Sequence, residues 1–172
     1  VEHVEATRSP RTRVRYETST NGTLLDAERA AFLERHRVQT QVSFDGLPAA
    51  QDLRQPGTFR RLDRRLRELR RSSREFFEEC VEVSITLTGA NLPTLADSVD
   101  YLIDLGLATI HISPSLPPDP CWNAASPVEL RRQLALVCRS SRRHYRRTGR
   151  TPVAFLREER TRDRWSPPEM CA

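Results

Sequence analysis

The sequence contains no lysine: all 28 of its basic residues are arginine, and the formal net charge is +5. Aromatic residues make up only 6% of the chain, so few side chains are present that could stack on nucleic-acid bases. The arginines alternate with acidic residues on predicted helix surfaces, for example in residues 60–71. Such alternation is typical of a solvated helix face. We therefore expect no nucleic-acid partner, and an arginine-driven RNA or DNA binder is the least supported of three functional hypotheses.

Long apolar runs are missing as well. No stretch approaches the roughly 20 apolar residues that a membrane-spanning helix needs. No positively charged head followed by an apolar stretch marks a secretory signal. We expect a cytoplasmic protein with no membrane partner. The chain opens with Val1 in the middle of a polar segment, and we expect it to be a fragment of a longer protein.

The four cysteines lack the spacing of a metal site. Cys80, Cys121, Cys138 and Cys171 form neither a CxxC nor a CxxxCxxC pattern, which argues against a zinc or iron–sulfur site built from this chain alone. Without a secretory signal, a disulfide framework is not expected either. Cys80 and Cys138 are expected to be small buried or half-buried thiols.

The chain does contain a regular alternation of strand and helix patterns. The predicted strands are residues 13–20, 40–44, 80–88 and 107–113. The predicted helices between them are residues 27–36, a longer helix opened by residues 57–59, and residues 95–105. Asp26 is the expected cap of the first helix and Gly106 ends the last one. Alternation at this spacing predicts right-handed βαβ units and a parallel sheet.

Polar residues and glycine follow the predicted strands in a recognisable order. The first strand ends in Thr-Asn-Gly at residues 20–22 and the second in Ser-Phe-Asp-Gly at residues 43–46. These motifs resemble TNG and SLDG at the ends of the third and fourth strands of radical S-adenosylmethionine (radical SAM) enzymes. The family's fifth strand, V-x-x-T-L-T-x-x-N, is similar to residues 83–91, and its sixth follows a helix ending in Leu-Gly, here residues 105–106.

The resemblance covers residues 14 to 116 and is to the sulfatase-maturase-like branch, whose members modify peptides or proteins and carry a cysteine-rich SPASM extension. It implies an α/β fold, with residues 1–118 forming a partial (βα) barrel of parallel strands, strands three to six of the family's barrel. Residues 119–172 would be a helical connector toward the extension, and Cys171 would be a metal ligand where that extension opens.

The resemblance also implies two cofactors, S-adenosylmethionine (AdoMet) and a 4Fe–4S cluster, and a peptide or protein substrate. The residues that match AdoMet-binding positions are Ser43, Asp45, Arg54, Thr86 and Ser113. Because parallel strands end on one side of a sheet, we expect these residues to share one concave surface, with the Asp and Arg at its rim. The family's CxxxCxxC loop and GGE motif are absent, so we expect no activity from this chain alone.

Each candidate residue has an ordinary structural alternative. The Ser43 hydroxyl can equally bond a neighbouring backbone group, and Asp45 with Gly46 can form a tight turn. Arg54 is one of 28 arginines, most of which belong on the surface, and His111 is expected to be structural. The second functional hypothesis is accordingly a non-catalytic βα scaffold or interaction module.

Overall fold

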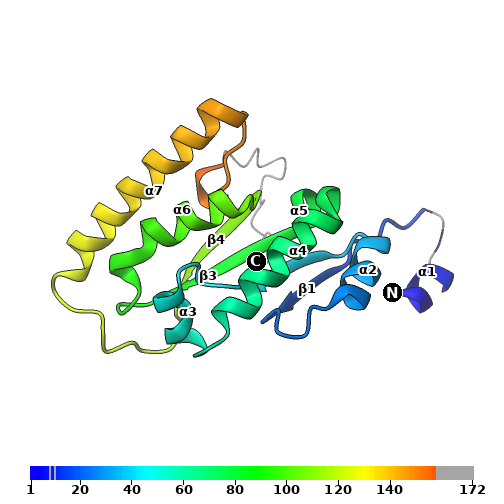
Figure 1. The fold of residues 1–172 in the computed structure, drawn as a ribbon, viewed down its shortest axis with the longest axis horizontal. Coiled ribbons are helices and arrows are strands. Elements are labelled where there is room, and N and C mark those ends of the chain that lie inside the picture. The colour runs from blue at the N-terminus through cyan, green and yellow to red at the C-terminus, as the bar shows by residue number, and fades with distance from the viewer. Residues whose placement is uncertain (8, 10, 158–172) are drawn as a thin grey trace, which may run out of the picture.

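Four parallel strands in the order β1-β2-β3-β4 form one sheet. The strands are β1 (Glu17–Thr20), β2 (Gln39–Ser43), β3 (Val81–Leu87) and β4 (Thr109–Pro114). They belong to a computed structural model that describes residues 1–7, 9 and 11–157 (Figure 1). The predicted α/β class with parallel strands is confirmed, and the described strands form an open sheet, not a closed barrel.

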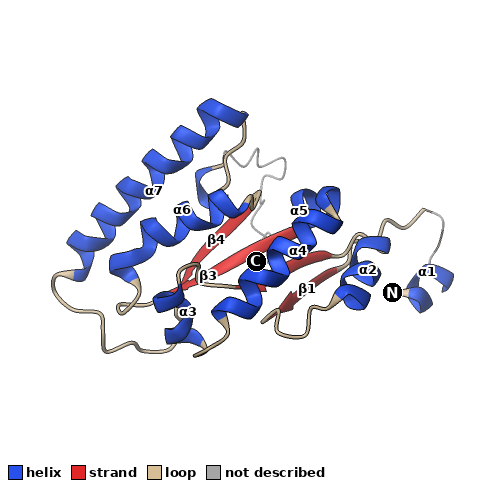
Figure 2. Cartoon of the chain, viewed as in Figure 1, coloured by secondary structure: helices blue, strands red, loops and turns tan. Residues whose placement is uncertain are grey.

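Helices cover one face of this sheet. The helices of the described chain are α1 (Glu2–Thr7), α2 (Ala27–Arg35), α3 (Pro48–Arg54), α4 (Phe59–Ser72), α5 (Arg74–Cys80), α6 (Leu95–Leu105) and α7 (Ser126–Thr148), with short 3-10 turns η1 (Leu92–Thr94) and η2 (Ala154–Leu156). In Figure 2, α2, α4, α5 and α6 all lie on the same side of the strands. The predicted caps are confirmed: the Asp26 carboxylate accepts the Arg29 N–H at 2.9 Å, and Gly106 adopts a φ of 91° at the end of α6.

Side chains alternate between the two faces of the sheet, as strand geometry requires. On the helix-covered face the strand residues are apolar, and Val42, Val83 and Ile110 are fully buried. Leu62 and Leu66 of α4 belong to the same buried cluster. The buried Cys80 thiol also joins this cluster, as its position before an apolar strand predicts.

The chain after β4 packs on the same core. Val137 of α7 and Val153 before η2 are fully buried and belong to the cluster that contains the strand residues. Residue 153 also forms a parallel bridge with Ile110 of β4. The described part of the predicted connector, residues 119–157, is therefore packed against the α/β unit, while residues 158–172 lie outside the described residues.

A buried amide joins α7 to α6. The Gln133 side chain is 2% exposed, donates to the Pro93 carbonyl at 2.6 Å and accepts the Ala96 N–H at 2.9 Å. Both backbone groups belong to the first turns that lead into α6, where the N–H groups have no partner inside the helix.

Within the described part of the chain, no helix is long and apolar enough to cross a membrane.

Two short helices differ from the prediction, and one strand boundary differs by more than two residues. The sequence patterns do not predict α3 and α5, which flank α4 on either side. Pro48 stands in the first turn of α3, where its missing N–H and fixed φ suit a helix start. β1 begins at Glu17 rather than at residue 13, so the edge strand is shorter than its β-branched composition suggests.

Three aromatic rings join β2, α4 and α6 near the carboxyl ends of the strands. Phe44 directly follows β2, and its ring centroid lies 5.7 Å from that of Phe59 and 6.3 Å from that of Tyr101. The Tyr101 hydroxyl donates a hydrogen bond to the Asp63 carboxylate. Burial and, after it, this hydrogen bond raise the pKa of Tyr101 to about 12.

Alkaline titration should therefore resolve one unusual tyrosine. Of the three tyrosines in the chain, one is expected to ionise near pH 12, and Tyr101→Phe should remove that step. Because the folded pKa lies above the ordinary value of 10.0, the stability that Tyr101 contributes is present below pH 10 and is lost as the pH rises toward 12. Ultraviolet absorbance measures the titration. Tyr145→Phe, at an exposed site, is the control, and a late step that survives Tyr101→Phe would contradict the assignment.

Candidate ligand-binding site

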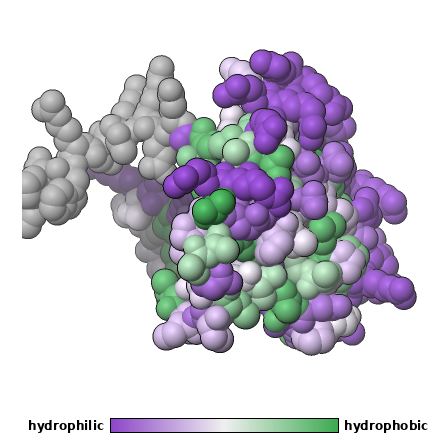
Figure 3. Space-filling view, turned by 90° about the vertical axis from the view of Figure 1, so that its left-hand side faces the viewer, coloured by the Kyte–Doolittle hydropathy of each residue, from purple (hydrophilic) through white to green (hydrophobic). Residues whose placement is uncertain are grey.

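The carboxyl ends of the four strands lie along one edge of the sheet because all the strands run in the same direction. Strand register places Ser43 opposite Ser84, and Thr86 opposite Ser113. Figure 3 looks onto this end of the molecule, where apolar and weakly polar residues occupy much of the middle and lower part and strongly hydrophilic residues gather at the top and right. The structure thus brings Ser43, Thr86 and Ser113 to one end of the sheet, as the sequence predicts.

The face of the sheet away from the helices is polar throughout. Alternation and register assign to it Glu17, Ser19, Gln39, Gln41, Ser43, Glu82, Ser84, Thr86, Thr109, His111 and Ser113. The interior of a packed barrel is filled instead by bulky apolar residues. A face without any apolar side chain cannot form a dry core, because buried polar groups need hydrogen-bonding partners. This face is suited to water or to a polar ligand.

His111 contributes a hydrogen bond to the polar face. Its Nε2 lies 2.8 Å from Oε2 of Glu82 on the neighbouring strand, with both side chains half-buried. A carboxylate only accepts hydrogen bonds, so the imidazole donates from Nε2. The pair lines a cavity of about 340 Å³ together with Gln41 and Ser19, which are hydrogen-bonded to each other at 3.1 Å.

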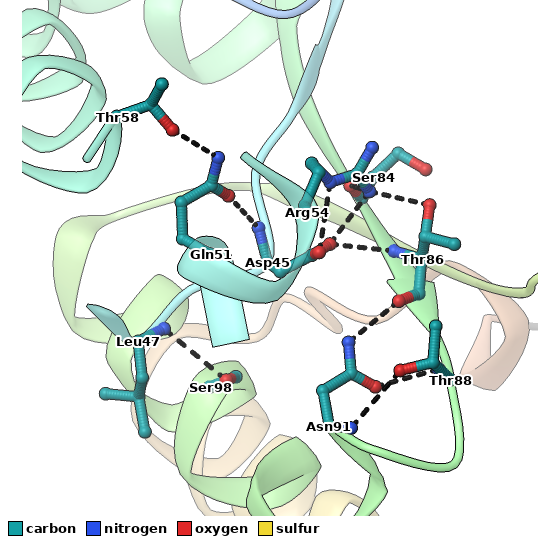
Figure 4. A network of polar contacts seen from close by, with 10 residues as sticks. All are labelled: Asp45, Leu47, Gln51, Arg54, Thr58, Ser84, Thr86, Thr88, Asn91 and Ser98. Atoms are coloured by element: carbon teal, nitrogen blue, oxygen red, sulfur yellow. Dashed lines mark hydrogen bonds and ion pairs between the residues drawn. The ribbon is translucent and has the colours of Figure 1, made fainter. Parts of the chain in front are cut away.

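A buried carboxylate organises the ends of β2 and β3. Asp45 is 2% exposed, and its two oxygens accept hydrogen bonds from Arg54 Nε at 3.0 Å and Nη2 at 2.8 Å (Figure 4). The backbone N–H of Thr86 also donates to this carboxylate, at 2.8 Å. Arg54 Nη2 lies 2.6 Å from the Thr86 hydroxyl and 3.4 Å from the Ser84 carbonyl. One guanidinium therefore links α3 to two strands.

Two amide side chains fix the surrounding backbone. Gln51 of α3 accepts the Asp45 N–H at 3.0 Å and donates to the Thr58 hydroxyl at 2.9 Å. Asn91 donates to the Thr86 carbonyl and accepts the Thr88 N–H, each at 2.8 Å. Sequence reasoning assigned no role to Gln51, because its only signal is its place in a helix that the patterns do not predict.

The structure corrects one position and separates the candidates into two groups. Asp45 was expected at the rim of a concave surface, but it is buried, because a carboxylate placed between two strand ends is compensated by Arg54 and by the Thr86 N–H. In contrast, the hydroxyl groups of Ser43 and Ser113 form no hydrogen bond with any of the described residues. The alternative that Ser43 bonds a neighbouring backbone group is therefore not what the structure has. Nη1 of Arg54 also has no hydrogen-bond partner among the described residues, so these three groups can still form hydrogen bonds with a ligand.

A cavity of about 260 Å³ opens beside Arg54. It is lined by Asp45, Leu53, Arg54, Thr86, Thr88, Ala90, Asn91 and Asp119. Asp119 comes from the proline-rich segment after β4 and did not stand out in the sequence, because a lone Asp among prolines reads as an ordinary turn residue. The cavity therefore combines residues from α3, the end of β3 and the segment after β4.

The described residues do not fit an iron–sulfur cluster. No group of three or more His, Cys, Asp or Glu side chains within residues 1–7, 9 and 11–157 is arranged to hold a metal ion. Cys80 is buried, Cys121 is exposed and Cys138 is intermediate, and all three thiols are free. Cys171, the predicted metal ligand, lies outside the described residues.

Comparison with known proteins finds similarity by structure alone. No protein-family profile matches the chain, and no curated protein matches its sequence. A structure of native anSMEcpe with bound AdoMet and Kp18Cys peptide matches with a TM-score of 0.71 and 16% identity over 90% of this chain. Native anSMEcpe with bound AdoMet and Cp18Cys peptide matches with a TM-score of 0.70 and 14% identity over the same share. A histidine-tagged form of anSMEcpe with bound AdoMet matches with a TM-score of 0.68 and 16% identity over 84% of the chain, and the match covers 41% of that protein.

These matches establish the fold. The anSME proteins are anaerobic sulfatase-maturating enzymes of the radical SAM class. The chain spans 44% of the length of the first two structures, so it corresponds to less than half of such a protein. Identities of 14% and 16% carry no residue-by-residue assignment of chemistry.

Proposed function

We propose that this chain forms the AdoMet-binding half of a radical SAM enzyme that modifies a peptide or protein. The observation that carries the proposal is the open set of polar groups at the carboxyl edge of the sheet: the Ser43 and Ser113 hydroxyls and one guanidinium nitrogen of Arg54. The fold that presents them is the fold of proteins whose structures hold AdoMet and a peptide. AdoMet binding is the function that best accounts for both features.

In this proposal the residues divide the binding task. Ser43 offers a hydroxyl that can donate to or accept from an oxygen of the ligand. Arg54 presents Nη1 to a carboxylate such as that of the methionine moiety, a pairing favoured by its delocalised positive charge. Asp45 lies at the same cavity as Arg54 and holds it through both of its oxygens. Thr86 and Ser113 complete the polar edge.

Bound AdoMet would supply the 5′-deoxyadenosyl group that radical SAM chemistry uses. The 4Fe–4S cluster of that chemistry has no ligand set in the described residues, so we place it in another part of the protein. The proposal also includes a cysteine-rich SPASM extension, in which Cys171 is a metal ligand, and a peptide or protein substrate. The polar sheet face, which none of the described helices covers, is the surface on which we place the substrate, since its side chains offer hydrogen bonds rather than a dry core.

Loss of the Ser43 hydroxyl tests the site. In the full-length protein, Ser43→Ala should weaken AdoMet binding by about 0.5–1.5 kcal/mol, the net contribution of one neutral hydrogen bond. Isothermal titration calorimetry measures the affinity. Ser72→Ala at the end of α4, outside the polar edge, is the matched control and should leave it unchanged. Equal affinities of the two variants would show that Ser43 does not contact AdoMet. A wild-type protein that binds no AdoMet would overturn the proposal.

The alternative function is a non-catalytic βα scaffold or interaction module. The specific observation in its favour is that the described residues hold no cluster ligands, while arginine-rich helices face outward. The two hypotheses differ in AdoMet binding, which only the first requires. The calorimetric measurement on the wild-type protein therefore decides between them.

A further inference from the structure

The segment that follows β4 turns back across the end of β3. The Ser115 N–H donates to the Leu87 carbonyl at 2.9 Å, immediately after Pro114 closes the strand. Prolines at 117, 118 and 120 then restrict the backbone. Trp122 packs against the hydrophobic core and α7 begins four residues later, at Ser126.

One carboxylate fastens this segment to the turn after β3. Asp119 accepts the Gly89 N–H through Oδ2 at 2.6 Å and the Cys121 N–H through Oδ1 at 2.9 Å. These two backbone hydrogen bonds, that of Gly89 first, lower the pKa of Asp119 below its ordinary value. The carboxylate is therefore ionised at neutral pH, the state in which both of its oxygens accept hydrogen bonds.

The contact requires glycine at position 89. A Cβ atom on Gly89 would lie 2.4 Å from the carbonyl carbon of Cys121 and 2.7 Å from the backbone nitrogen of Trp122. Both neighbours are backbone atoms, which cannot rotate away as a side chain can. The two chain segments therefore touch backbone to backbone, and Asp119 bonds across the contact.

Asp119 also lines the cavity of about 260 Å³ beside Arg54 and Thr86. We propose that Asp119 is a positioning residue, which together with Gly89 holds residues 114–123 in place beside this cavity, where Arg54 and Thr86 would contact AdoMet. This inference rests on the proposed function for the identity of the ligand. Its physical basis is preorganisation: a wall that is already fixed need not be ordered when the ligand binds, so less binding free energy is lost.

The experiment compares Asp119→Ala with Asp26→Ala in the full-length protein. Each substitution removes a carboxylate that accepts a backbone N–H, but Asp26 caps α2 and does not line this cavity. Both variants should melt at a lower temperature than wild type. At a temperature well below both transitions, Asp119→Ala should bind AdoMet at least fivefold more weakly by calorimetry, and Asp26→Ala should bind within twofold of wild type. Gly89→Ala should reproduce the Asp119→Ala effect.

Hydrogen exchange provides a readout that does not depend on the ligand. Amides in residues 114–123 should exchange faster in Asp119→Ala and at the wild-type rate in Asp26→Ala. Unchanged exchange would overturn the role of Asp119 in holding the segment. Faster exchange with unchanged AdoMet affinity would overturn the positioning role. If the wild-type protein binds no AdoMet, the proposed function is wrong and AdoMet is not the ligand of this cavity. The exchange rates would still decide whether Asp119 holds residues 114–123 in place.

Discussion

Arg54→Ala is expected to lower the free energy of unfolding by about 3–5 kcal/mol, because it leaves a buried carboxylate without its cation. The Asp45 side chain is 3% exposed and that of Arg54 is 24% exposed, so water does little to replace the guanidinium. The substitution also removes the donors to the Thr86 hydroxyl and the Ser84 carbonyl. Chemical denaturation measures the loss.

Two further variants show whether the cost comes from the unpaired charge. Asp45→Asn in the Arg54→Ala background should recover part of the stability, because a neutral amide is less costly to bury than a carboxylate. Arg143→Ala is the control, since Arg143 pairs with Asp100 at 3.3 Å on the surface and such pairs contribute about 0–1 kcal/mol. A loss below about 1 kcal/mol for Arg54→Ala would show that the Asp45 pair is dispensable.

Gly46→Ala is expected to cost about 2–4 kcal/mol, from backbone strain and overpacking together. Gly46 has a φ of 89°, a region that L side chains rarely adopt. An added Cβ would also lie 2.7 Å from Cβ of Ser98 and 3.0 Å from its Cα, at the point where β2 leads into α3 beside α6. The Leu47 N–H donates to the Ser98 hydroxyl at 3.4 Å, so the displacement would loosen that contact too.

Gly57→Ala separates the two causes. Gly57 has a similar φ of 74°, but a Cβ there would meet nothing within 4 Å. Its loss of stability should therefore report backbone strain alone, about 1 kcal/mol. The difference between the two variants measures the steric contact with Ser98. Equal losses in denaturant unfolding would show that α6 moves to accommodate the methyl group.

The sequence predicts the fold well because its strongest signals are periodic. Residues 81–87 alternate without a break, and the structure has β3 at Val81–Leu87 with strictly alternating burial. The helix that Gly106 ends is also found where its apolar spacing and cap place it. Local pattern is weaker for α3 and α5, which are seven residues each and depend on contacts with the sheet and with α4.

The candidate site is less predictable because its contacts are long in sequence. Asp45 bonds the Thr86 N–H, which lies 41 residues away, and Arg54 reaches the Thr86 hydroxyl, 32 residues away. Nothing local distinguishes Arg54 from the other arginines of the chain. The resemblance to radical SAM motifs selects both residues, but only the structure shows that Asp45 is buried and holds Arg54. Asp119 and Gly89 meet across 30 residues, a pairing without any periodic signal.

The division of the sheet into an apolar and a polar face also has a consequence for folding. A strand displaced by one residue along its neighbour turns every side chain to the opposite face. For β3, such a slip would point Glu82, Ser84 and Thr86 toward the helices and Val83 and Ile85 toward water. Each buried polar group left without a partner would cost about 1–3 kcal/mol. The polar face therefore makes mispaired sheets unfavourable while the chain collapses. This role in folding is separate from any role in binding a ligand.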